Sequence, residues 1–98
     1  MAPDFIAESV GYQVVSASGN ISPKSVALCG IFVSNAASTP TITIYDDAAT
    51  GTTVPLVNTF TPVSGTYYKL PFRALNGLNV VIGGTVSCTV ALQAETLK

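Results

Sequence analysis

The sequence contains no histidine and no tryptophan, and it carries little charge. Histidine is the commonest general base and the commonest ligand for transition metals, so its absence removes the usual means of acid–base and metal chemistry. Neither cysteine has an activating residue nearby in the sequence, and Gly83-Gly84 lacks the glycine spacing and the lysine of a phosphate-binding loop. We therefore expect a protein that is not an enzyme and that uses no cofactor or metal.

Basic residues and long apolar runs are also scarce. The longest apolar run, Val26–Val33, is far shorter than the ~18 residues that a membrane span needs. Residues 1–6 include no basic residue and no long apolar stretch, so we expect no signal peptide and folding in the cytoplasm. A nucleic-acid-binding protein needs a basic surface, and the four basic residues are scattered singly: Lys24, Lys69, Arg73 and Lys98. We expect neither a membrane nor a nucleic acid as partner.

The low charge itself indicates an assembled protein. Charged residues make up 9% of the chain, against about 25% in typical soluble domains, and the formal net charge is −1. Most polar side chains are short hydroxyls, 9 Ser and 12 Thr, which lose water against a neighbour at lower cost than Lys or Glu. Net charge normally keeps free monomers apart. This composition favours a protein whose surface is partly covered by other subunits.

Apolar residues alternate with polar ones through most of the chain, with β-branched residues and turn signals between the runs. This period of two predicts strands and no helix. The fold class that we expect is all-β: a single β-sandwich of seven to eight short strands, of jelly-roll or immunoglobulin-like type. Residues 1–8 are expected to form an N-terminal arm, residues 9–92 the sandwich domain, and residues 93–98 a C-terminal tail.

Particular runs allow finer expectations. Ser25–Ser34 is apolar on both faces, with Val26, Leu28, Gly30 and Phe32 on one and Ala27, Cys29, Ile31 and Val33 on the other. One domain of this size has one interior, so an arm or a neighbouring subunit must cover the second face. Pro55 predicts that Thr53–Thr61 is an edge strand. Asn76-Gly77 and Gly83-Gly84 are typical of tight hairpin turns.

The two cysteines, Cys29 and Cys88, lie inside apolar runs, where free cysteine behaves as a small buried hydrophobe. We expect Cys88 to be buried with Val86, Val90 and Leu92. Thiols of cytosolic proteins stay reduced, which favours two free cysteines. A disulfide between neighbouring strands is the alternative.

Asp46-Asp47 is the one acidic pair in the sequence. A calcium site is one interpretation, but adjacent residues of an extended strand point in opposite directions, and the spacing of a calcium-binding loop is absent. The other interpretation is a turn whose carboxylates accept hydrogen bonds from nearby backbone N–H groups. The second is favoured.

Aromatic and apolar residues supply the remaining interface candidates. Tyr67 and Tyr68 are adjacent in a predicted strand, so one ring should face the core and the other should face outward. The outward ring can contact a protein or stack on a sugar. Phe5 and Ile6 lie outside the regular strand pattern, and they can pack on their own domain or reach a neighbouring subunit. We favour the neighbour. The full set of candidate interface residues is Phe5, Ile6, Asp46, Asp47, Tyr67 and Tyr68.

Three motifs, Leu28–Ser34, Thr41–Thr52 and Asn76–Val90, resemble small all-β virion proteins of tailed bacteriophages. The resemblance extends from Ser25 to Leu92, about two-thirds of the chain. It implies a capsid decoration (cement) protein, often a homotrimer at a symmetry axis of the shell, with the major capsid protein or other virion proteins as partners. It also implies location in the virion after assembly in the host cytoplasm, and no catalytic residues.

Three functional hypotheses follow. The first is a cement protein that clamps neighbouring capsid subunits. The second is a neck, tail or fibre component of the virion. The third is a receptor- or carbohydrate-binding module that uses Tyr67, Tyr68 and the Asp46–Gly51 loop.

Overall fold

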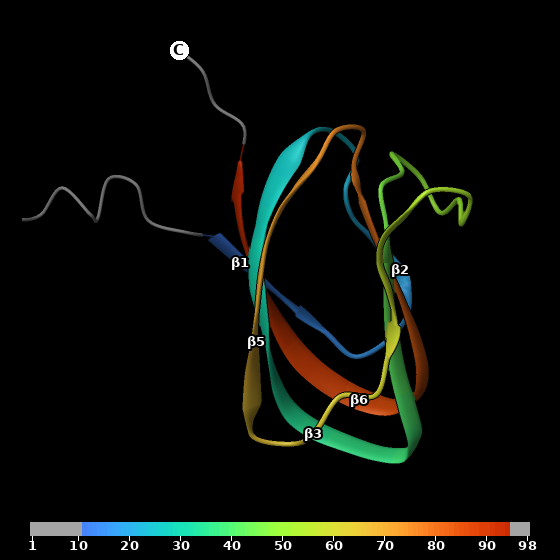
Figure 1. The fold of residues 1–98 in the computed structure, drawn as a ribbon, viewed down its shortest axis with the longest axis vertical. Coiled ribbons are helices and arrows are strands. Elements are labelled where there is room, and N and C mark those ends of the chain that lie inside the picture. The colour runs from blue at the N-terminus through green and yellow to red at the C-terminus, as the bar shows by residue number, and fades with distance from the viewer. Residues whose placement is uncertain (1–10, 95–98) are drawn as a thin grey trace, which may run out of the picture.

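The computed structural model describes residues 11–94, and all of their regular structure is β (Figure 1). Six strands form one antiparallel sheet, and no helix occurs between residues 11 and 94, so the all-β prediction is confirmed. Within this range there is accordingly no helix that could cross a membrane. The strands are β1 (Gly11–Val15), β2 (Gly19–Ser22), β3 (Val26–Tyr45), β4 (Pro55–Phe60), β5 (Thr66–Ala74) and β6 (Leu78–Ala94).

Two long strands, β3 and β6, pair with each other from Val26↔Ala94 to Tyr45↔Asn79 and form the spine of the sheet. Both bend at the bottom of Figure 1, so that the sheet folds back on itself. The register shifts between Ala37 and Thr41, where Ser38 and Thr39 have positive φ angles, and Gly84 of β6 has a φ of 69°. Bulges of this kind increase the bend of a strand.

The bend leaves the expected count of seven to eight strands unconfirmed. Gly83-Gly84 was predicted to join two strands as a hairpin turn, which would pair residues 78–82 with residues 85–92. Both segments instead pair with β3, so they belong to one strand, and the runs 25–34 and 41–45 are likewise two parts of β3. The described residues therefore form six strands where seven to eight short ones were expected.

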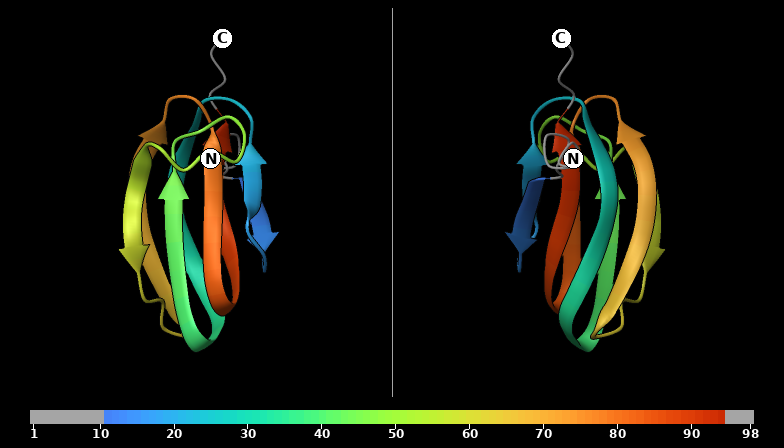
Figure 2. Two further views of the ribbon diagram at one scale, coloured as in Figure 1. Left: turned by 90° about the vertical axis from the view of Figure 1, so that its right-hand side faces the viewer. Right: turned by 90° about the vertical axis from the view of Figure 1, so that its left-hand side faces the viewer.

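The fold-back divides the sheet into two halves, which Figure 2 shows from both sides. The β1 half consists of β1, residues 86–94 of β6, residues 26–37 of β3, and β5, in that order. The β2 half consists of β2, residues 78–83 of β6, residues 41–45 of β3, and β4. Each of β1, β2, β4 and β5 pairs with a single neighbour, so these four strands are edges, as Pro55 predicted for β4.

The hydrophobic core lies between the two halves and draws on both of them. Its buried side chains are Val15, Val26, Leu28, Ile31, Val33, Ile42, Ile44, Ala74, Leu78, Val80, Val86, Cys88 and Val90. Their burial stabilises the fold by roughly 1.5–3 kcal/mol for each large side chain. Cys88 is buried beside Val86 and Val90 as predicted, whereas Leu92 is half-buried.

A bulge in the first part of β3 changes which residues face the core. The register against β6 shifts between Leu28 and Gly30, and the extra residue on β3, Cys29, reverses the alternation after it. The predicted faces are therefore wrong beyond Leu28: Ile31 and Val33 point inward, and Phe32 points outward.

Several boundaries differ from the sequence-based ones. Residues 18–20 were expected to be a turn, but Gly19–Ser22 forms β2, a short edge strand with a register shift. The segments 65–70 and 71–75 form the single strand β5. β6 continues to Ala94, two residues into the expected C-terminal tail. The expected N-terminal arm, residues 1–8, lies outside the described residues.

Gly84 permits the bend, and its replacement is expected to destabilise the fold. A Cβ atom at this position would crowd the carbonyl oxygens of Ser38 and Thr39, and the positive φ disfavours any other residue. We expect Gly84→Ala to lower the free energy of unfolding by about 2 kcal/mol. Gly19→Ala is the matched control, because a Cβ there meets nothing within 4 Å. Urea denaturation of both variants measures the difference; equal midpoints would show that the bend does not depend on Gly84.

The two thiols are free and lie in different environments, as the reduced-state prediction required. Cys88 is fully buried, its Sγ donates to the Val15 carbonyl at 3.6 Å, and burial raises the pKa of its thiol. Cys29 is partly exposed on β3. Because the reactive form of cysteine is the thiolate, we expect alkylation of Cys29 alone in the native protein and of both after unfolding. Mass spectrometry of the labelled chain counts the adducts, and failure to label either thiol in denaturant would indicate a disulfide.

Candidate protein interface

Asp46 follows the end of β3 and is 8% exposed. Its carboxylate accepts hydrogen bonds from the backbone N–H groups of Leu75 (3.1 Å), Asn76 (2.7 Å) and Gly77 (3.3 Å) in the connection between β5 and β6. Burial by itself would raise the pKa of Asp46, but these three donors outweigh burial and hold the pKa below its usual value. Asp46 thus fastens the 75–77 connection to the end of β3.

Asp47 points elsewhere and shapes its own loop. Its Oδ1 accepts from the backbone N–H groups of Ala49 (2.8 Å) and Gly51 (3.1 Å), which is the turn geometry expected of an Asp at this position. The Asn20 side chain donates to the carbonyls of Asp47 and Ala49 and ties the loop to β2. The two carboxylates therefore serve two different loops, and no cluster of three metal-ligating side chains occurs in the part of the chain that the structure describes.

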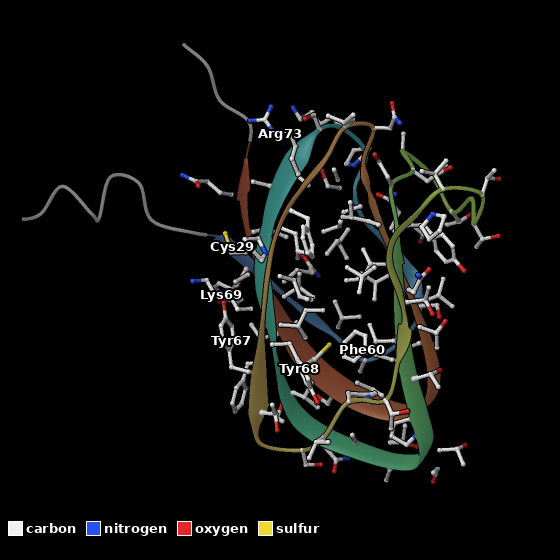
Figure 3. All side chains as sticks on the ribbon, viewed as in Figure 1. Cys29, Phe60, Tyr67, Tyr68, Lys69 and Arg73 are labelled. Carbon is white, nitrogen blue, oxygen red and sulfur yellow. The ribbon has the colours of Figure 1, made fainter. Side chains whose placement is uncertain are left out.

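Tyr68 is the inward-facing tyrosine of the pair. Its ring lies 5.0 Å from that of Phe60, at an interplanar angle of 57°, and its hydroxyl accepts from the backbone N–H of Val63 at 3.0 Å. Figure 3 shows the two labelled rings pointing toward each other inside the fold. β5 and β4 are edge strands of opposite halves, and they do not pair with each other. The contact between Tyr68 and Phe60 therefore joins the two halves at these edges.

Tyr67 points outward, on the opposite side of β5, and is 52% exposed. Its hydroxyl donates to the Cys29 carbonyl at 3.5 Å, so the ring lies across β3 at Gly30. A Cβ atom on Gly30 would clash with the Tyr67 ring and with the Tyr68 carbonyl. The absence of a side chain at Gly30 thus leaves room for the Tyr67 ring to lie over β3.

The outer face of the β1 half carries a row of apolar side chains. Residues that pair directly across strands share a face of the sheet, and the pairs Val14↔Thr89, Phe32↔Thr89 and Phe32↔Tyr67 place all four residues in one row. Phe32 is 43% exposed, and Tyr12, on the same side of β1 as Val14, is 73% exposed. We call Tyr12, Val14, Phe32 and Tyr67 the outer aromatic face.

A groove adjoins this face at the edge of the β1 half. It has a volume of about 650 Å³ and is lined by residues of the paired strands β3 and β5. Its lining is Ala27, Leu28, Cys29, Tyr67, Lys69, Pro71, Phe72 and Arg73. The labelled side chains of Cys29, Tyr67, Lys69 and Arg73 follow this edge in Figure 3. The groove combines apolar and aromatic walls with two cations.

The structure therefore separates the predicted interface residues. Tyr67 lies on the outer face and Tyr68 lies in the interior. Asp46 holds the connection between β5 and β6, and Asp47 holds the loop that follows β3. Phe5 and Ile6 lie outside the described residues. Sequence analysis missed Tyr12, Phe32 and Phe72. The sequence could have identified Tyr12, because it lies three residues from the apolar Val15 on one strand and therefore faces the opposite side. The outward orientation of Phe32 depends on the bulge at Cys29, which the sequence does not reveal.

Comparison with known proteins gives no relatives: no family model, no curated protein and no solved structure matches this chain.

Proposed function

We propose that this chain is a non-enzymatic structural protein of a tailed-phage virion, a decoration protein that stabilises the capsid by clamping neighbouring subunits. The observation that carries the proposal is the position of the aromatic residues. Of the seven in residues 11–94, four are more than 40% exposed, and all four belong to the β1 half: Tyr12, Phe32, Tyr67 and Phe72. Exposed apolar clusters of this kind mark surfaces that other proteins cover.

The strand order supports a fold suited to this role. We propose a jelly-roll sandwich, in which the bends in β3 and β6 divide each into two strands. The six strands then become eight, in two four-stranded layers ordered β1-β6-β3-β5 and β2-β6-β3-β4. Eight strands in two interleaved Greek keys define the jelly roll, which is frequent among capsid proteins.

Self-association is the second part of the proposal. A surface with few charges has little repulsion to keep copies apart, and the outer aromatic face offers Tyr and Phe, the side chains enriched in the cores of interfaces. A homotrimer at a threefold axis of the shell is the arrangement that the phage resemblance implies. The major capsid protein is the proposed partner.

A carbohydrate-binding role has weaker support. Sugar sites combine an aromatic platform with side chains that hydrogen-bond hydroxyls in fixed directions. Beside Tyr67 the polar side chains lining the groove are the cations Lys69 and Arg73. The carboxylates of Asp46 and Asp47 accept backbone hydrogen bonds in loops of their own. The outer aromatic face therefore favours a protein surface as its ligand.

Copy number in purified virions tests the proposal. A shell protein that occupies repeated symmetry sites is present in hundreds of copies, whereas a neck, tail or fibre part is present in a few to a few dozen. Quantitative mass spectrometry against the major capsid protein measures the ratio. We expect hundreds of copies; a few dozen would favour the tail assignment, and absence from the particle would overturn a virion role.

A further inference from the structure

Asn76 and Gly77 form the single Asn-Gly pair of the sequence and lie in the connection between β5 and β6. The pair was predicted to form a tight hairpin turn, but β5 and β6 do not pair with each other, and neither residue has a positive φ angle. Close packing is what requires Gly77. A Cβ atom at this position would lie 2.5 Å from the Asp47 carbonyl oxygen and 2.6 Å from that of Ser22.

An Asn-Gly pair is prone to a spontaneous reaction with water. The backbone nitrogen of the glycine attacks the side-chain carbonyl carbon, Cγ, of the asparagine, a C–N bond forms, and ammonia leaves with the proton that the nitrogen loses. Water then opens the resulting five-membered cyclic imide and yields aspartate or isoaspartate. Glycine permits the attack because no side chain shields its nitrogen. Asn76 is exposed, so water has access to its side chain.

The Asp46 carboxylate holds both residues of the pair. Its Oδ1 accepts from the backbone N–H of Asn76 at 2.7 Å and from that of Gly77 at 3.3 Å. Consecutive N–H groups of an extended chain point in opposite directions, so two that converge on one oxygen place their nitrogens on the same side of the Cα–C bond of Asn76. Gly77 is buried, and its carbonyl also accepts from the backbone N–H of Asp47 at 3.2 Å.

This conformation keeps the reacting atoms apart. Closure of the imide ring requires the Cβ of Asn76 to eclipse the nitrogen of Gly77 about the Cα–C bond, because both atoms become members of one flat ring. The Cβ and the nitrogen of Asn76 are a third of a turn apart about that bond. When the two nitrogens lie on the same side, Cβ does not, and the rotation that would bring it there breaks the hydrogen bonds to Asp46.

We propose that Asn76-Gly77 is a latent deamidation site and that Asp46 suppresses its reaction in the folded protein by fixing the conformation of the pair. The reaction would place a second carboxylate beside Asp46 or, as isoaspartate, lengthen the main chain by one methylene group. Either product would release the 75–77 connection from the end of β3. Asp46 therefore protects the covalent structure of this connection as well as its fold. The inference does not depend on the assembly role.

The deamidation rate of Asn76 in the full-length chain tests the proposal. Wild type and Asp46→Ala are incubated at mildly alkaline pH, both in the native state and unfolded in urea. Peptide mapping by mass spectrometry, with fragment masses that assign the change to residue 76, measures the rate and the share of isoaspartate. We expect the native wild type to react at least ~10-fold more slowly than the unfolded chain and at least ~10-fold more slowly than native Asp46→Ala. Asn76→Gln, which cannot close the five-membered ring, controls for the site and should give no isoaspartate at this position.

Gly84→Ala separates local release of the pair from unfolding of the whole domain. This variant is expected to destabilise the fold while leaving the Asp46 hydrogen bonds in place. The rate through global unfolding equals the rate in urea multiplied by the unfolded fraction, which the urea denaturation curve of each variant supplies. The rate of Gly84→Ala should exceed that of the wild type by no more than this contribution, whereas Asp46→Ala should exceed it clearly. If Asp46→Ala does not fold, Asp46→Asn, which keeps one acceptor oxygen, should show the same effect at smaller size.

Three results would overturn the proposal. A native wild type that deamidates as fast as the unfolded chain would show that the fold does not protect the pair. A rate for the Asp46 variants that global unfolding fully accounts for would show that the carboxylate is not what protects it. A slower rate in those variants would show that the carboxylate promotes the reaction as a base.

Discussion

Replacing Asp46 with alanine is expected to lower the free energy of unfolding by about 3 kcal/mol, because the variant leaves three backbone N–H groups without their acceptor. Such a loss is large against the ~5–15 kcal/mol that typically separates folded from unfolded domains. The 75–77 connection also orders the start of β6, which pairs with both β2 and β3. Urea denaturation at neutral pH measures the change.

Asp47→Ala is the matched control. Asp47 accepts two backbone hydrogen bonds, but in the exposed turn of its own loop, where water can replace the lost acceptor. We expect a loss of about 1 kcal/mol for this variant. Equal losses for the two variants would contradict the assignment of Asp46 as the residue that fastens the 75–77 connection.

The effect of Asp46 should also depend on pH. The pKa of Asp46 is depressed in the folded state, because the three N–H donors outweigh the effect of burial. The stabilisation that Asp46 provides is therefore fully present above the unfolded carboxyl pKa of about 3.9. It is lost as the pH falls through the lower pKa of the folded state. The stability difference between the wild type and Asp46→Asn should therefore narrow on acidification below about pH 4. Urea midpoints measured over that range test the sign, and a gap that widens would contradict it.

Removing both rings at the centre of the outer aromatic face should produce the largest effect on assembly. Phe32 and Tyr67 are neighbours across β3 and β5 and expose about half of their surface. Aromatic residues at the centre of an interface contribute about 2 kcal/mol or more each, so Phe32→Ser with Tyr67→Ser should weaken self-association by roughly 1000-fold. Light scattering over a dilution series measures the shift.

The control for this pair is Val54→Ser with Val63→Ser. These valines are exposed to a similar extent, 51% and 57%, but they lie outside the outer aromatic face. Their replacement removes apolar surface without touching the proposed interface, so the association constant should stay within about twofold of the wild type. Equal weakening by both pairs would indicate association that is not specific to the outer aromatic face.

The sequence predicts the strands well and the bends poorly. Alternation of apolar and β-branched residues identifies most strand-forming segments, and Pro55 correctly places β4 at an edge. The fold-back at Ser38-Thr39 and Gly84 escapes prediction, because Gly-Gly is also typical of hairpin turns. Only the pairing of both parts of β6 with β3 distinguishes a bend within one strand from a hairpin turn between two strands.

The sequence predicts only part of the candidate interface, because alternation along a strand can be read from it and a bulge cannot. Period two correctly requires that Tyr67 and Tyr68 point to opposite sides, and the burial of Tyr68 against Phe60 fixes which one is outside. The bulge at Cys29 shifts the alternation by one residue, and the sequence contains no separate sign of it. Consequently the sequence groups Phe32 on one face with Val26 and Leu28, which point inward, although Phe32 belongs to the surface that supports the proposed function.

Co-sedimentation with empty capsids of the tailed phage that is proposed to encode the chain tests the central claim most directly. The full-length protein should sediment alone as an oligomer, with the mass of a trimer, and should bind the capsids until their sites are filled. The variant carrying Phe32→Ser and Tyr67→Ser should remain folded and should bind far more weakly. A full-length chain that stays monomeric at high concentration and does not sediment with the capsids would contradict both the self-association and the decoration role.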